Sequence, residues 1–119
     1  MLSLAIALAV SAEPQGPNDP FKMYIDSIVH PPYVAACSSI FSKYPNLTEL
    51  LETELKSWEE RHNSEIEAGS KIASDKGFTP GSTAFEMAKT AALRGAEELK
   101  RKGAGQAEYC DSLIRELRR

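Results

Sequence analysis

The stretch "LTELLETELKSWEERHNSEIEAGSKIASDK", residues 47–76, is the longest run of the chain with a helical spacing of apolar side chains. Its apolar positions recur three or four residues apart, which is the repeat of one face of an α-helix. Asn46 and Glu49 match a capping box at its start, and Gly77 is a typical residue to follow a helix end. We therefore predict one long helix, with Gly69 as the place for a kink or a close helix crossing. Its inward stripe is expected to be Leu47, Leu51, Leu55, Trp58, His62, Ile66, Gly69, Ile72 and Ala73.

Two shorter helices are predicted before this stretch. Asp19-Pro20 is typical of a helix start, with a capping side chain followed by proline in the first turn. Pro31 disfavours the helical backbone at His30, so we expect the first helix to end there. A second helix is then expected over residues 32–44, and it places a cysteine on its buried face.

After the long helix, "GFTPGST" at residues 77–83 has the composition of a turn. A fourth helix is expected next, capped by Thr79 or Thr83, and a fifth over residues 106–118. No run alternates between apolar and polar residues for long enough to form a strand. The sequence therefore predicts an all-α bundle of about five helices, with the long helix central and antiparallel to the fourth.

The first residues have the pattern of an export signal. Residues 1–12, "MLSLAIALAVSA", are an apolar run that ends in small residues, as signal peptides do before their cleavage site. This run is shorter than the roughly 20 residues of a membrane-spanning helix. We predict a signal peptide at 1–12, a flexible leader at 13–18 and a single helical domain at 19–119, in a protein exported to the periplasm or the extracellular space.

Export determines how the two cysteines of the chain, Cys37 and Cys110, are interpreted. In an oxidising compartment, two distant cysteines in a small chain are most simply one disulfide. The alternative, a catalytic thiol at Cys37, needs a neighbouring base, and Pro31-Pro32 separates it from His30. We therefore expect a disulfide that joins the second predicted helix to the fifth.

The charge of the chain favours a protein partner. The formal net charge is -3, which argues against nucleic-acid binding because that function normally shows a basic surface. The most asymmetric charged segment lies between Glu49 and Glu67, and an acidic helix face there can attract a basic or neutral partner protein. The candidate face consists of Glu49, Glu52, Glu59, Glu60, Glu65 and Glu67.

A metal site is a weaker possibility in this sequence. Glu59 and His62 are three residues apart and share a helix face, so both side chains can reach one ion. Di-metal bundles carry two such pairs, and here there is one. Adding Asp26 and His30 would complete a mononuclear site, but no spacing requires it. We expect His62 to be a half-buried, hydrogen-bonded residue of the helix stripe, and we predict no metal, cofactor or catalytic residue.

The chain shows no nucleophile elbow and no phosphate-binding glycine loop after a strand, so we do not expect an enzyme. The favoured hypothesis is an exported protein-binding module, of the inhibitor or immunity type, that uses the acidic face. One alternative is a carrier that holds a small apolar ligand between helices. Its cavity would be lined by Phe21, Tyr24, Trp58 and Phe85.

Overall fold

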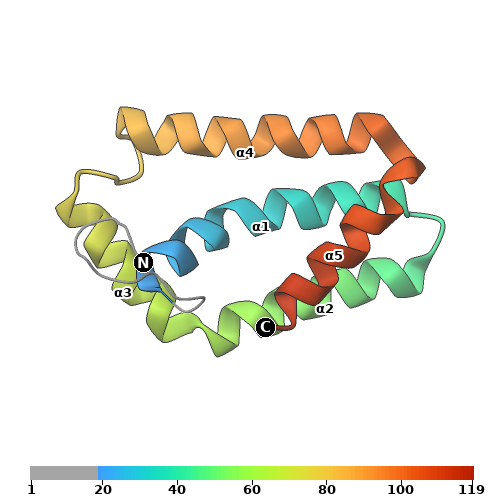
Figure 1. Ribbon diagram of the computed structural model, residues 1–119, viewed down its shortest axis with the longest axis horizontal. Coiled ribbons are helices and arrows are strands. Elements are labelled where there is room, and N and C mark those ends of the chain that lie inside the picture. The colour runs from blue at the N-terminus through green and yellow to red at the C-terminus, as the bar shows by residue number, and fades with distance from the viewer. Residues whose placement is uncertain (1–18) are drawn as a thin grey trace.

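The computed structural model describes residues 19–119, and these form an all-α bundle, as predicted (Figure 1). Residues 1–18, which contain the predicted signal peptide and leader, lie outside the described part. Within residues 19–119, no helix is both long enough and apolar enough to cross a bilayer. The elements are α1 (Pro20–Ile40), α2 (Pro45–Arg61), α3 (Asn63–Asp75), α4 (Thr83–Lys102), the 3-10 helix η1 (Gly103–Gln106) and α5 (Ala107–Leu117).

Helix α1 begins where the sequence predicts but does not stop at His30. The Asp19 carboxylate accepts a hydrogen bond from the backbone N–H of Lys22 at 3.0 Å, and Pro20 occupies the first turn. The helix then continues through Pro31 and Pro32 to Ile40, so the prediction of two separate helices was wrong. An interior proline costs a helix about 3 kcal/mol. Here buried residues on both sides of the proline pair, from Met23 to Cys37, provide compensating packing.

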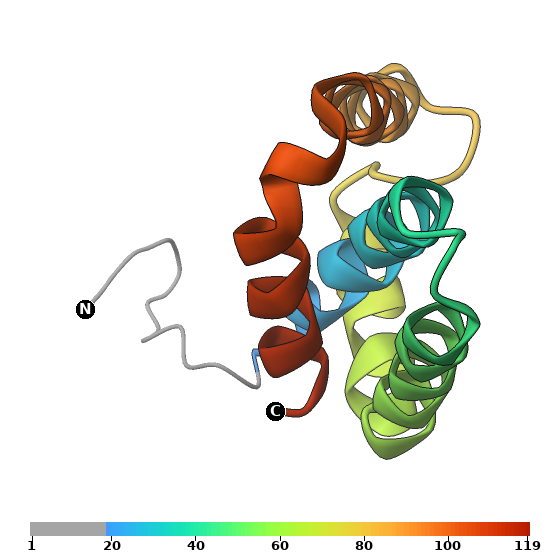
Figure 2. The ribbon, with the colours of Figure 1, turned by 90° about the vertical axis from the view of Figure 1, so that its right-hand side faces the viewer.

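The central helix of the bundle is α1. It packs against α2, α3, α4 and α5, which surround it in the end-on view (Figure 2). Helix α4 runs alongside α1 in the same direction (Figure 1). Helices α2 and α3 run in the opposite direction to α4, but α1 lies between them and α4 (Figure 1). The predicted direct packing of the 47–76 helix against the fourth helix was therefore wrong.

The 47–76 segment is two helices rather than one. The chain breaks at His62, whose backbone angles are φ -109° and ψ 18°, and α3 then leaves in a new direction (Figure 1). The kink is thus at His62 and not at Gly69. Gly69 instead makes the close helix crossing, because a Cβ built on it would lie 1.9 Å from the carbonyl oxygen of Pro20.

Two helix caps also differ from the predictions. Helix α2 begins with Pro45, and Tyr44 precedes it without a capping side-chain bond, so Asn46 and Glu49 form no capping box. Helix α4 is capped by Ser82, whose hydroxyl accepts the N–H of Phe85 at 3.2 Å, rather than by either threonine. Each start lies one to three residues from its prediction, which is the usual precision of helix ends.

The predicted disulfide is present and links α1 to α5. Cys37 and Cys110 are both buried, with Cα atoms 5.9 Å apart. The bond lies within a core cluster to which α1, α2, α4 and α5 all contribute. The buried members of this cluster are Met23, Val34, Ala36, Cys37, Leu51, Trp58, Ala96, Leu99, Cys110, Leu113, Ile114 and Leu117.

Candidate functional site

Four of the predicted acidic residues share one side of α2. At about 100° per residue, Glu49, Glu52, Glu59 and Glu60 fall within an arc of about 100°. This arc is opposite Leu51 and Trp58, which are buried. Glu49, Glu52 and Glu60 are exposed, while Glu59 is half-buried. We call these four glutamates the α2 acidic face.

The other two predicted glutamates lie on α3 and do not extend this face as one stripe. Glu67 is exposed and Glu65 is half-buried. Two residues along a helix correspond to a rotation of about 200°, so these side chains leave α3 on opposite sides. The change of direction at His62 separates them further from the glutamates of α2.

Few positively charged side chains balance the carboxylates of α2 and α3. Helices α2 and α3 together carry eight acidic and three basic residues, a formal net charge of -5. Within residues 19–119, none of the six predicted glutamates has a basic side chain within 4.0 Å, although Lys56 lies in the same arc of α2. Glu54, outside the predicted set, is paired with Arg118 at 2.8 Å.

A surface hollow of about 490 Å³ adjoins one end of the α2 acidic face. It lies at the connection between the end of α1 and the start of α2, and most of the side chains that line it carry a hydroxyl or a carboxylate group. The hydroxyl oxygen of Ser38 is buried and makes no hydrogen bond with any residue of the described chain. The lining residues are Ser38, Ser42, Pro45, Asn46, Thr48, Glu49 and Glu52.

A column of three aromatic rings crosses the bundle between α1 and α2. The ring of His30 meets Trp58 edge-on at 4.8 Å, and Trp58 lies 5.4 Å from His62. His62 is buried rather than half-buried, and neither ring nitrogen has a hydrogen-bond partner in residues 19–119. The expectation of a hydrogen-bonded His62 was therefore wrong. The helix break places this residue at the end of α2, against the tryptophan.

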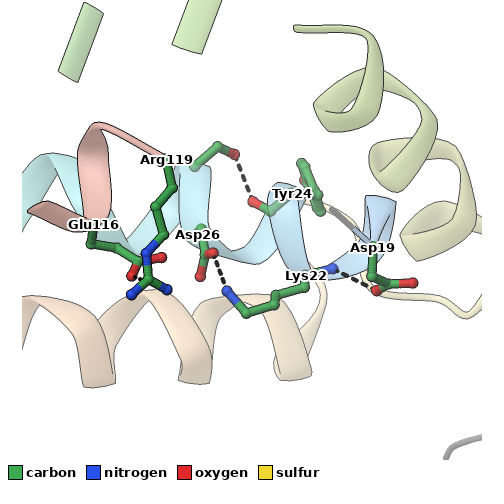
Figure 3. A network of polar contacts seen from close by, with 7 residues as sticks. Asp19, Lys22, Tyr24, Asp26, Glu116 and Arg119 are labelled. Carbon is green, nitrogen blue, oxygen red and sulfur yellow. Dashed lines mark hydrogen bonds and ion pairs between the residues drawn. The ribbon is translucent and has the colours of Figure 1, made fainter. Parts of the chain in front are cut away.

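His30 belongs to a cluster with two carboxylates. Asp26, His30 and Glu116 each place one potential ligand atom within 4.8 Å of the others, and this is the single such group of three in residues 19–119. Lys22 pairs with Asp26 at 2.6 Å, and Arg119 pairs with Glu116 at 3.4 Å (Figure 3). The tetrad considered from the sequence is not assembled, since Glu59 and His62 are not part of the cluster.

The protonation of His30 is governed mainly by burial, which lowers its pKa from the ordinary value. The carboxylates of Asp26 and Glu116 act in the opposite direction, and Lys22 adds to the lowering. Because burial is the largest influence, the neutral imidazole is favoured near neutral pH. A neutral ring leaves one nitrogen free to accept a proton or to bind a metal.

Sequence reasoning missed Glu116, although the cysteines contained the necessary signal. His30 precedes Cys37 by seven residues, and Glu116 follows Cys110 by six. If the two helices run antiparallel from the disulfide, these intervals correspond to about 10 Å and 9 Å along each axis. The two residues then reach the same level, which is what the structure shows.

Three of the four aromatic residues of the carrier hypothesis are divided between two separate groups. Phe21 and Phe85 both contact Phe78, at 6.2 and 5.3 Å between ring centroids. Trp58 belongs to the histidine column instead. The carrier hypothesis remains a prediction from sequence, and these ring contacts give it no added support.

No protein-family model, curated protein or solved structure matches this chain.

Proposed function

We propose that this chain is an exported interaction module that binds a basic surface of a partner protein through the α2 acidic face and the adjoining hollow. One observation carries the proposal. Glu49 and Glu52 belong to both the face and the hollow, and neither carboxylate is engaged in an ion pair within the described chain.

The chemistry of the hollow suits a lysine or arginine side chain. Lysine offers three N–H donors and arginine five, and neither has an acceptor. The hollow offers mainly acceptors, which include the two carboxylates and the hydroxyls of Ser38, Ser42 and Thr48. Hydrogen bonds between ionised groups are shorter and roughly twice as strong as neutral ones. A basic side chain inserted here would also give the buried Ser38 hydroxyl a new donor.

Two further features support this function. The disulfide holds the end of α1 that forms one wall of the hollow, and a rigid site loses less conformational entropy when it binds. The same bond and the predicted signal peptide fit the proposed export, since disulfides persist mainly in oxidising compartments. The net charge of -5 on α2 and α3 would increase the association rate with a basic partner, most strongly at low salt.

Charge reversal at the hollow is expected to abolish this binding. Glu49→Lys combined with Glu52→Lys should weaken the affinity for the partner at least 100-fold, because it replaces two attractive charges with two repulsive ones. The control is Glu97→Lys combined with Glu98→Lys, which makes the same change in net charge on the exposed surface of α4. Because it also breaks the ion pairs that these two glutamates make within α4, its helix content is compared with that of the parent by circular dichroism. Its affinity should stay within about three-fold of the parent, since distant exposed charges are largely screened.

The measurement uses the three proteins side by side. Each is immobilised and exposed to the extracellular or envelope fraction of its own source, and a captured protein is then titrated by surface plasmon resonance. Support requires a partner retained by the parent and the α4 variant but lost by the Glu49/Glu52 variant. If every captured protein binds all three alike, or responds only to net charge, the proposal is rejected.

A further inference from the structure

The cluster of Asp26, His30 and Glu116 joins two helices that are also joined by the disulfide. Asp26 and His30 are four residues apart on α1, so they lie on the same side of the helix one turn from each other. Glu116 comes from the last turn of α5. In each residue one potential ligand atom lies within 4.8 Å of the other two.

His30 differs from the two carboxylates of this cluster, because it has a buried ring nitrogen without a hydrogen-bond partner in residues 19–119. The residue is 8% exposed, and its Nε2 atom has no hydrogen-bond partner among residues 19–119. A buried polar atom without a partner costs roughly 1–3 kcal/mol. One ring nitrogen lies within 4.8 Å of an oxygen of each carboxylate. Burial lowers the pKa of the ring, which favours the neutral form that binds metals.

The two carboxylates are only partly engaged. Lys22 forms an ion pair with Oδ2 of Asp26, and Arg119 forms one with Oε1 of Glu116 (Figure 3). Within the described chain, the second oxygen of each carboxylate accepts no hydrogen bond. The side chains of Asp26 and Glu116 are 17% and 37% exposed, which leaves a route from solvent to the cluster.

We propose that Asp26, His30 and Glu116 form a binding site for a divalent transition-metal ion of the zinc or cobalt type. One imidazole nitrogen and two carboxylate oxygens are a donor set that suits these ions better than Ca²⁺ or Mg²⁺, which prefer oxygen alone. Three protein ligands leave the fourth tetrahedral position for water. The bound ion would be a second link between α1 and α5.

The geometry needs only a small adjustment to accept the ion. Ligand atoms around tetrahedral zinc lie about 3.4 Å apart, since each is about 2.1 Å from the metal. The present separations of up to 4.8 Å therefore have to shorten by at most about 1.4 Å. Rotation of the partly exposed Asp26 and Glu116 side chains can provide this. The ammonium of Lys22 competes for Asp26, so its removal should strengthen metal binding.

The test is titration of the full disulfide-bonded protein, freed of metal with EDTA, with Zn²⁺ by calorimetry. We expect one ion per chain, and at least ten-fold weaker binding for Glu116→Gln. Glu108→Gln is the matched control, because Glu108 is also on α5 but is exposed and unpaired within residues 19–119. This control should bind like the parent, whereas Lys22→Ala should bind several-fold more tightly.

A second readout separates this site from general attraction to carboxylates. The chain has two histidines, so the ring signals of His30 and His62 can be followed individually by NMR during Co²⁺ addition. The His30 signals should be shifted and broadened far more than those of His62. The site is refuted if Zn²⁺ does not bind at millimolar concentration, if folded Glu116→Gln and Asp26→Asn both bind like the parent, or if the His62 signals are perturbed first.

Discussion

Replacing Cys37 and Cys110 together with alanine is expected to lower the free energy of unfolding by about 4 kcal/mol. The bond closes a segment with a sequence separation of 73 residues, and in the chain-entropy account a loop of this length restricts the unfolded chain by about that amount. Small domains are stable by about 5–15 kcal/mol, so the loss is a large fraction of the total. The thermal midpoint should fall by roughly 15–30 °C.

Equilibrium unfolding in urea, followed by circular dichroism, measures this change. Ser39→Ala combined with Ser112→Ala is a matched control, because both serines are exposed on the same two helices, and it should differ from the parent by less than about 0.5 kcal/mol per site. A thiol reductant should destabilise the parent and leave the alanine variant unchanged. A loss below about 1 kcal/mol would show that the disulfide contributes little to stability.

Gly69→Ala is the second substitution expected to have a large effect. The new Cβ would lie 1.9 Å from the carbonyl oxygen and 2.6 Å from the carbonyl carbon of Pro20. These are backbone atoms at the start of α1, which cannot rotate away as a side chain can. Helix α1 therefore has to move away from α3 to make room for the new methyl group. We expect a loss of about 2 kcal/mol, because overpacking outweighs the gain of about 1 kcal/mol in helix propensity.

Gly95→Ala supplies the matched comparison for this crossing. Its Cβ would also come within 1.9 Å of a neighbour, but that atom is the hydroxyl oxygen of Tyr33, at the end of a movable side chain. The change in stability should stay within about 1 kcal/mol of the parent, since the gain in helix propensity offsets the adjustment. Equal destabilisation by the two substitutions in urea would contradict the proposed difference between backbone and side-chain contact.

Local rules predicted the helical segments well but failed at two positions where packing opposed them. Pro31 and Pro32 carry the local signal for a helix end, yet α1 continues through them because it packs against helices on several sides. Residues 47–76 have one continuous helical period, yet the chain turns at His62. The break allows Gly69 to reach Pro20 and Trp58 to contact both histidines.

The candidate sites also contain one part that helical spacing predicts and other parts that depend on the packing of distant segments. The glutamates of the α2 acidic face follow from helical spacing alone, because residues on one helix keep a fixed angular relation. The hollow beside them does not, since it depends on how the end of α1 meets α2. Glu116 was missed because its neighbours in the cluster are 86 or more positions away in the chain.

By itself the sequence determined the helical class, the pairing of the cysteines and the acidic character of α2. These depend on apolar periodicity, on the number of cysteines and on composition. Each of these properties can be read from a short segment or from a residue count, without knowing which distant segments are in contact. Only the tertiary structure decided that α1 is the central helix, that the long segment bends at His62 and that Asp26, His30 and Glu116 meet. The physical reason is that these features depend on packing between distant segments, whose combined free energy exceeds the local preference of any one residue.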